Sequence, residues 1–173
     1  EIDYELELCI VIGKNAKCVN SDQAQNCIAG YCIANDVSAR SVTFKKNRNE
    51  RPWDDFFDWL NGKWADNFLP VGPYLTTKDE INDVQSLDME LQVNGEVRQK
   101  ANTNQMIYSA AEIVSFISRL MTLEPGDIIC TGTPAGVAKA TGNFLKTGDL
   151  IECQIENLGK LNNTLGQRPE NFY

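Results

Sequence analysis

The chain has 173 residues, of which 42% are hydrophobic and 23% charged, which suffices for one domain with a hydrophobic core. Its net charge of −8 disfavours binding to nucleic acid or to an anionic membrane, since both require clustered lysine and arginine. We therefore expect a small-molecule partner, no nucleic acid and no membrane. The sequence also has no histidine, which excludes Ser-His-Asp triads and imidazole zinc sites.

The first predicted strand, residues 4–12, contains two glutamates. Alternation along a strand places Glu5 and Glu7 on one side, and the apolar residues on the other. Two converging carboxylates need a counter-charge, supplied by lysine, arginine or a hard divalent metal. The alternative is the solvated face of an edge strand.

A short helix is predicted from Ser21, and a second strand spans residues 29–36 and ends on Asn35 and Asp36. A turn is expected at residues 37–40. Asp36 is the natural third carboxylate ligand, and three carboxylates with water suit Mg²⁺ or Mn²⁺ better than zinc. The alternative for Asp36 is a side chain that only forms an Asx-turn.

Residues 43–66 are polar, charged and aromatic, which predicts a long surface segment with some helix, whose aromatic residues cover another part of the molecule. Lys63 follows Gly62 in this segment. A lysine among aromatic residues could neutralise an oxyanion or, with a lowered pKa, move a proton, whereas an exposed loop lysine is the commoner case. Proline and glycine in residues 68–75 argue against a central strand throughout that range.

Residues 87–99 alternate between apolar and polar around Asn94-Gly95, which predicts a hairpin with a type I′ turn. Ser109 begins a capping box, and the following helix carries apolar residues at helical spacing: Ile113, Phe116, Ile117 and Leu120. Residues 123–130 and 145–153 repeat one pattern, a turn followed by an apolar strand. The first copy leads into Thr131-Gly132-Thr133-Pro134, whose hydroxyls and amides could bind a carboxylate or form a plain turn.

The six cysteines show no paired CxxC spacing. We expect most of them to be reduced core residues, although a disulfide framework is the competing interpretation. Reduced cysteines predict a cytoplasmic or similarly reducing location. They are Cys9, Cys18, Cys27, Cys32, Cys130 and Cys153.

The ordered set of motifs resembles the fumarylacetoacetate hydrolase family over nearly the whole chain. Each motif is weak alone, but the order is specific. The matching segments are Asp3-Tyr4-Glu5-Leu6-Glu7, Gly30-Tyr31, residues 35–40, Gly62-Lys63, residues 68–73, residues 93–96, Pro125-Gly126-Asp127 and residues 131–137.

This resemblance implies a mainly β (α+β) fold with a rolled, barrel-like mixed sheet, few helices and a metal site. By position, Glu5, Glu7 and Asp36 match the family's metal ligands for Mg²⁺ or Mn²⁺. Lys63 matches a catalytic residue, and the matching substrate-binding residues are Arg40, Gly132 and Thr133. Family members are commonly homodimers that act on 2-oxo and 2,4-dioxo acids, cleaving a carbon–carbon bond by hydrolysis, decarboxylating, or isomerising a double bond.

The sequence departs from the family pattern in two places. Ser41 and Thr43 stand where the family often has aspartate and glutamine. Hydrolytic members usually carry a His-Glu pair in a lid upstream of the first glutamate motif, whereas this sequence starts at Glu1 and contains no histidine. We expect residues 1–173 to be a single catalytic domain that lacks the amino-terminal portion of a longer protein. Its expected activity is hydrolysis of an acylpyruvate-type or fumarylpyruvate-type acid, or isomerisation of a 2-hydroxy-diene-dioate. The alternatives are an oxaloacetate-type decarboxylase and a catalytically silent metal-binding relative.

Overall fold

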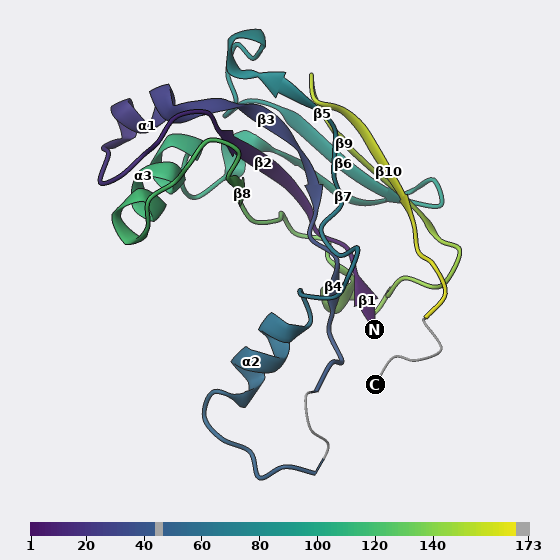
Figure 1. Ribbon diagram of the computed structural model, residues 1–173. Coiled ribbons are helices and arrows are strands. Elements are labelled where there is room, and N and C mark those ends of the chain that lie inside the picture. Colours follow the sequence, from purple (N-terminus) through teal and green to yellow (C-terminus); the bar gives the residue numbers. More distant parts are fainter. Residues whose placement is uncertain (44–46, 169–173) are drawn as a thin grey trace.

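Two four-stranded sheets form the body of the molecule in a computed structural model that describes residues 1–43 and 47–168 (Figure 1). The first sheet has the order β5 (Val71–Thr77), β3 (Ile28–Asn35), β2 (Leu6–Ile12) and β8 (Ile128–Cys130). The second has the order β10 (Gly159–Thr164), β9 (Leu150–Ile155), β6 (Asp88–Val93) and β7 (Glu96–Asn102). A small third sheet pairs β1 (Ile2–Asp3) with β4 (Ser38–Ala39).

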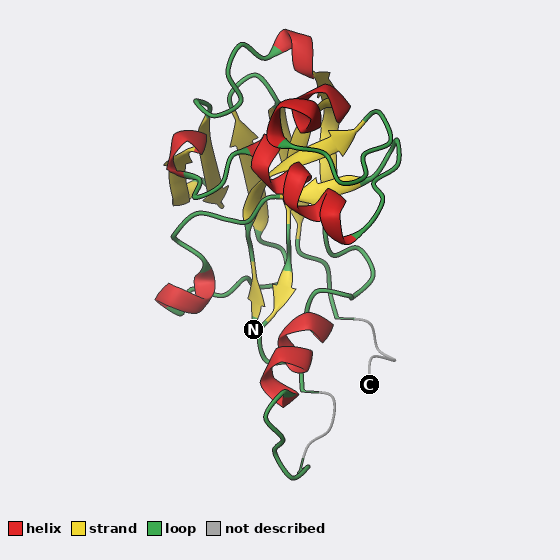
Figure 2. Ribbon diagram, turned by 90° about the vertical axis from the view of Figure 1, so that its left-hand side faces the viewer, coloured by secondary structure: helices red, strands yellow, loops and turns green. Residues whose placement is uncertain are grey.

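The helices are short and few. Helix α1 (Ser21–Cys27) lies beside α3 (Ala110–Leu120) at one end of the sheets, whereas α2 (Asp54–Asn61) projects from the body near β1 and β4 (Figures 1 and 2). The remaining helical segments are α4 (Ala138–Thr141) and two 3₁₀ turns, η1 (Lys78–Glu80) and η2 (Thr103–Gln105).

The main core contains apolar residues of both large sheets, including Leu8 and Ile10 of β2, Leu91 of β6 and Ile155 of β9, each at most 1% exposed. The prediction of a mainly β fold with few helices is confirmed. The sheets curve without closing into a barrel (Figure 1), and every strand ladder within the described residues is antiparallel rather than mixed. Strand β2 is central in its sheet because it lies between β3 and β8.

Several local predictions are confirmed. Asn94 and Gly95 both have positive φ, 52° and 81°, as the type I′ turn between β6 and β7 requires. Ser109 caps α3 in a capping box with Glu112. The stretch from residue 68 enters β5 only at Val71, and β5 is an edge strand.

Two local predictions are wrong. The expected turn at residues 37–40 contains β4, because Ser38 and Ala39 pair with Asp3 and Ile2. The apolar face predicted for α3 is only partly the buried one: Phe116 and Leu120 are 63% and 65% exposed.

The buried face of α3 instead carries Ser115 and Ser118, which bond to the backbone of Val19. Serine hydroxyls can be buried at little cost in free energy when they form hydrogen bonds with the backbone of a neighbouring loop. Within residues 1–43 and 47–168, no helix is long and apolar enough to span a membrane.

Candidate metal centre and active site

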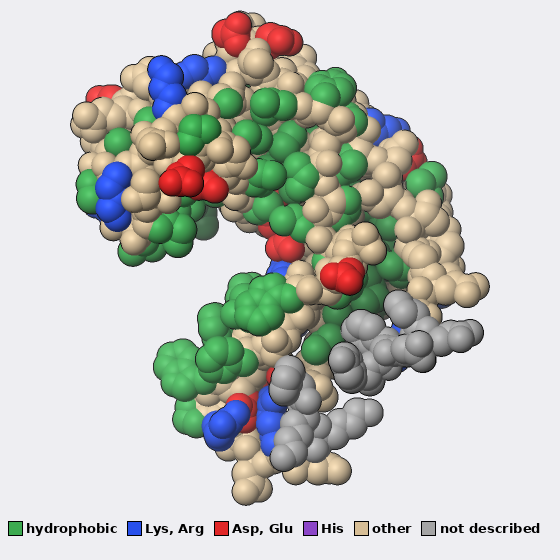
Figure 3. Space-filling view, viewed as in Figure 1, with side chains coloured by type: hydrophobic (Ala, Val, Ile, Leu, Met, Phe, Trp, Pro, Cys, Tyr) green, Lys and Arg blue, Asp and Glu red, His purple; other side chains and the backbone are tan. Residues whose placement is uncertain are grey.

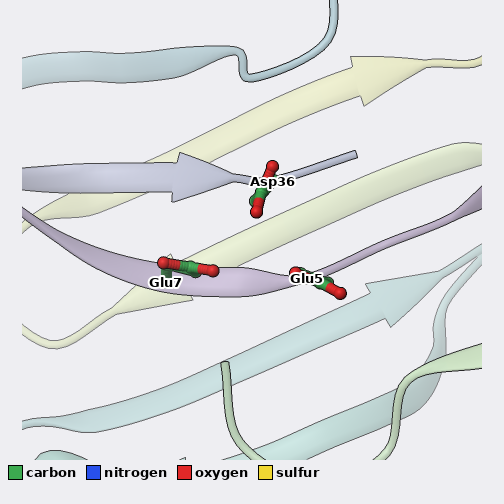
Figure 4. Close-up of side chains that lie close together, drawn as sticks. All are labelled: Glu5, Glu7 and Asp36. Atoms are coloured by element: carbon green, nitrogen blue, oxygen red, sulfur yellow. The ribbon is translucent and has the colours of Figure 1, made fainter. Parts of the chain in front are cut away.

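The carboxylates of Glu5, Glu7 and Asp36 lie together where β2 begins and β3 ends (Figure 4). One oxygen atom from each lies within 4.8 Å of the others. Glu7 lies in β2 and Glu5 just before it, so the alternation of extended backbone places both side chains on one side. Antiparallel pairing of β2 with β3 continues past both strands, and the Asp36 amide donates to the Glu5 carbonyl at 2.8 Å. The pairing of two adjacent strands therefore assembles the cluster that the sequence predicted.

The burial of these residues rules out the solvated edge-strand interpretation. Strand β2 is central, and Glu5 and Glu7 are only 8% and 3% exposed. Asp36 is half-buried. Buried carboxylates require compensating charge or hydrogen bonds.

Two cations contact the cluster. The Lys63 ammonium lies 2.7 Å from Glu5 Oε2 and 2.6 Å from Asp36 Oδ2, and the Arg40 guanidinium contacts Glu5 Oε1. Burial lowers the pKa of Lys63, but its hydrogen bonds to Asp36 and Glu5 outweigh burial, so this pKa is raised. Lys63 is therefore an ammonium in this arrangement, and its pKa is not lowered as a proton-moving lysine would require.

Asp3 adds a fourth carboxylate behind the cluster. It is fully buried and accepts a 2.9 Å hydrogen bond from Arg40 Nε, along with backbone bonds from Ala138 and Lys139 at the start of α4. With all four carboxylates ionised, two cations leave two negative charges uncompensated among these residues.

Glu7 is the least neutralised member of the cluster. Burial raises the pKa of Glu7 to about 7, and the nearby Asp36 and Glu5 carboxylates act in the same direction. A 2.7 Å hydrogen bond from the Gly132 amide to Glu7 Oε2 opposes this rise. The site thus favours a further positive charge near Glu7.

Thr131-Gly132-Thr133 brings the predicted substrate-binding segment to the cluster. Gly132 has a φ of +93°, a conformation that favours glycine, and it turns its amide toward Glu7. The Thr133 hydroxyl donates to the Leu6 carbonyl at 2.9 Å and accepts from Gln99 Nε2 at 2.9 Å. In this structure Thr133 therefore anchors the segment to β2, and its contact with a substrate stays a prediction, as does that of Arg40.

Gly62 positions Lys63. Its carbonyl accepts from the Ala39 amide at 2.8 Å, which ties the end of α2 to β4. A Cβ at Gly62 would lie 2.4 Å from the Ala39 carbonyl oxygen, so only glycine fits this approach. Lys63 also lies over the Trp59 ring, 5.7 Å from its centroid.

Sequence reasoning missed the buried polar residues that support the cluster. Besides Asp3, these are Asn35, whose Oδ1 accepts from the Glu5 amide at 3.1 Å, and Gln99, whose Oε1 accepts from the Leu6 amide at 3.0 Å. Gln99 is 93 residues from Leu6 in the sequence. Asp3 and Asn35 do stand inside the family-like motifs, but nothing in their spacing indicated a supporting role.

The expected covering role of residues 43–66 is not seen among the described residues. Trp53, Phe56, Phe57, Trp59 and Trp64 are 48–69% exposed. Figure 3 shows an apolar surface over the projecting segment, separated from the body by a hollow with acidic and basic side chains at its back. Lys45 and Lys46, which belong to the predicted segment, lie outside the described residues.

The donor set fits a hard divalent cation. All three candidate ligands are carboxylates, they converge within coordination reach of one another, and their charge is only partly neutralised. Mg²⁺ and Mn²⁺ favour such oxygen ligands, whereas zinc favours nitrogen and sulfur. Fold and site together define a class: mainly β proteins with a carboxylate-only cluster that suits a hard divalent cation.

The chain belongs to the fumarylacetoacetate hydrolase family, since the family model described as "Fumarylacetoacetate (FAA) hydrolase C-terminal" matches residues 1–166. A relative from Bos taurus, named "Oxaloacetate tautomerase FAHD2A, mitochondrial", is 44% identical over 94% of this chain and 50% of its own length. The chain therefore spans about half the length of the curated relatives it matches.

Solved structures agree with this assignment. The fumarylacetoacetate hydrolase of Exiguobacterium antarcticum superposes with a TM-score of 0.85 at 37% identity, over 97% of this chain and 57% of that one. A maleylpyruvate hydrolase of Sphingobium sp. SYK-6, solved in complex with manganese(II) and pyruvate, gives 0.80 at 36% identity, over 96% and 56%. Both structures belong to enzymes that are named hydrolases.

Proposed function

We propose that this chain forms the metal-dependent catalytic site of an enzyme that enolises a 2-oxo acid, with keto–enol tautomerisation of oxaloacetate as its reaction. The observation that carries the proposal is the contact of Lys63 with two carboxylates of an oxygen-only cluster. The name of the 44% identical Bos taurus relative supports the choice of oxaloacetate. Tautomerisation needs only proton transfer between a carbon and an oxygen.

Glu5, Glu7 and Asp36 would hold Mg²⁺ or Mn²⁺. When bound, such a cation supplies Lewis-acid stabilisation of the charge that develops on the 2-oxo oxygen. The related maleylpyruvate hydrolase was solved with manganese(II) and pyruvate, which supports this choice of metal and substrate class.

Lys63 would move the proton. With a divalent cation held by Glu5 and Asp36, the Lys63 ammonium would be free of these carboxylates and could face the substrate. In ketonisation, the Lys63 ammonium would donate a proton to the enol carbon that does not bear the oxygen, and the enol O–H would release its proton to water. The Lys63 amine would then regain a proton from solvent. Loss of its carboxylate partners would lower the pKa of Lys63 toward the range that proton transfer needs.

Carbon–carbon bond hydrolysis is the second candidate, because both solved relatives described above are named hydrolases. It requires the same enolate together with an activated water. Oxaloacetate decarboxylation, diene-dioate isomerisation and a silent metal-binding relative are the further alternatives, and each predicts a different product or none.

The test supplies Mn²⁺ or Mg²⁺ with enol-oxaloacetate and records loss of the enol absorbance, alongside CO₂ release and cleavage of an acylpyruvate. We expect enol loss to dominate, and Lys63→Met to lower its rate by about 10²-fold or more, as general acid–base residues commonly do. Lys160→Met, in an exposed ion pair with Glu152, is the matched control and should leave the rate unchanged. Acylpyruvate cleavage or CO₂ release faster than enol loss would overturn the proposal.

For the compartment, we propose a reducing interior. All six cysteines are free, and the relative from Bos taurus is named as mitochondrial. Its name favours mitochondria over the cytoplasm that the sequence suggested.

A further inference from the structure

Three free cysteines lie side by side on adjacent strands of the β5-β3-β2-β8 sheet. Cys9 of β2 is paired in register with Cys32 of β3 and with Cys130 of β8. The side chains of the three cysteines pack together in one small cluster of the core. Cys9 and Cys32 are buried and Cys130 is half-buried, so Cys130 is the member that a small oxidant reaches first.

The hydrogen-bond pattern of the sheet gives the Cys9–Cys130 and Cys9–Cys32 pairs different spacings. In an antiparallel ladder, residue pairs alternate between hydrogen-bonded pairs, with Cα atoms about 5.5 Å apart, and non-hydrogen-bonded pairs, with Cα atoms about 4.5 Å apart and closer side chains. Thr131 N donates to the Leu8 carbonyl at 3.2 Å, so Leu8 and Thr131 form a hydrogen-bonded pair. The next pair, Cys9 with Cys130, is therefore of the closer kind.

On the side of β2 that faces β3, the alternation of hydrogen-bonded and non-hydrogen-bonded pairs is reversed. Asp36 N donates to the Glu5 carbonyl at 2.8 Å, which makes Glu5 and Asp36 a hydrogen-bonded pair. Cys9 and Cys32 lie four residues along the same regular ladder, so they are also hydrogen-bonded and more widely spaced. Because a disulfide needs Cβ atoms about 3.5–4.5 Å apart, Cys130 suits Cys9 better than Cys32 does.

We propose that Cys9 and Cys130 are an oxidative modification site that forms a cross-strand disulfide when the protein meets a peroxide. The Cys130 sulfur attacks the peroxide, its O–O bond breaks, and sulfenic acid forms with release of water. The Cys9 sulfur then displaces hydroxide from that sulfenic acid, and the thiol proton leaves with it as a second water. Two thiols are oxidised and one peroxide is reduced.

The bridge would link two strands of the metal centre. Cys9 follows Glu7 on the same side of β2, and Cys130 precedes Thr131-Gly132, whose glycine amide donates to Glu7. Oxidation would therefore fasten the two segments that flank this carboxylate, without using any of the candidate ligands. It requires neither a bound metal nor turnover.

The experiment treats the full chain with hydrogen peroxide, blocks the remaining thiols with an alkylating reagent and maps the peptides by mass spectrometry without reduction. We expect a Cys9–Cys130 linked peptide in the wild type and in Cys32→Ala, and its loss in Cys130→Ala. Cys18→Ala is the control for an exposed thiol outside the triad and should retain the link. A Cys9–Cys32 link as the main product, or Cys9 still alkylated at full peroxide consumption, would overturn the proposal.

Thermal unfolding gives a second readout that does not depend on peptide recovery. The oxidised wild type should melt at a higher temperature than the reduced protein, because the bridge closes a long loop and restricts the unfolded chain. Dithiothreitol should reverse the increase, and oxidised Cys130→Ala should not show it. A midpoint that is equal in the oxidised and reduced wild type would contradict the bridge.

Discussion

Burial of Glu7 and the neighbouring carboxylates of Asp36 and Glu5 all raise the pKa of the Glu7 side chain. The pKa of this side chain is about 7 in the folded protein, against an ordinary value of 4.5. Between these values the folded state keeps a proton that the unfolded state has lost, so stability decreases as pH rises from about 4.5 to 7. The burial of an ionised Glu7 thus destabilises the metal-free protein at neutral pH.

This predicts the pH dependence of the metal-free protein. Its free energy of unfolding should fall by up to roughly 3 kcal/mol between pH 5 and pH 8, measured by denaturant titration in the presence of a chelator. Glu7→Gln keeps an acceptor for the Gly132 amide but cannot ionise, so its stability should change less over that range. Parallel profiles for the two proteins would show that Glu7 is not the titrating group.

The clustering of the three candidate ligands was predictable from sequence, but the residues that support them were not. Glu7 lies in β2 with Glu5 just before that strand, and Asp36 directly follows β3, so local patterns were enough to place them together. Gln99 contacts Leu6 across 93 residues, and no local periodicity reports such a contact. The raised pKa of Lys63 was also missed, because it depends on two carboxylates from other segments.

At the scale of elements, the hydrogen bond between Ala39 of β4 and Gly62, which follows α2, sets the position of Lys63. Gly62→Ala should push the chain away from the Ala39 carbonyl and displace the Lys63 ammonium from Glu5 and Asp36. We expect a loss of enolisation of about tenfold or more, with destabilisation of about 1–3 kcal/mol from the added crowding. Kinetics and denaturant unfolding measure the two effects.

Gly166→Ala is the matched control for that change, since nothing lies within 4 Å of a Cβ at Gly166. It should leave both the rate and the stability nearly unchanged. A Gly62→Ala protein with wild-type kinetics would mean that this close approach does not position Lys63.

Turn chemistry made several elements predictable. The repeated pattern in residues 123–130 and 145–153 forms the same turn twice: Asp127 Oδ2 accepts from the Glu124 amide and Asp149 Oδ2 from the Lys146 amide, each at 2.7 Å. Strands β8 and β9 follow these turns. The two-residue strand β4 could not be predicted, since its strand partner in the described part of the chain, β1, is equally short and distant in sequence.

For the whole molecule, we propose a homodimer. The apolar side chains of Phe116, Leu120 and Met121 at the end of α3 are 57–65% exposed, and Phe116 and Leu120 lie one turn apart on the helix. Exposed apolar surface is typical of interaction sites. Helix α3 lies away from α2, whose aromatic residues border the hollow beside the candidate site (Figures 1 and 3).

Sedimentation velocity tests this association. The wild type should sediment as a dimer, and Phe116→Glu should shift it toward monomer, because a charge in a buried apolar contact is costly. Trp64→Glu, a change of equal character in the α2 segment, is the control and should stay dimeric. A wild type that is monomeric over the whole concentration range would contradict the dimer.

The proposed function rests on binding of a divalent metal, which isothermal titration of Mn²⁺ into the chelator-treated protein measures. We predict one site per chain whose affinity rises with pH until Glu7 is ionised, near pH 7, and falls by at least about tenfold in Glu7→Ala. Glu152→Ala, a change of a partly exposed carboxylate on β9, should bind Mn²⁺ as the wild type does. Equal affinities for the wild type and Glu7→Ala would contradict the metal centre.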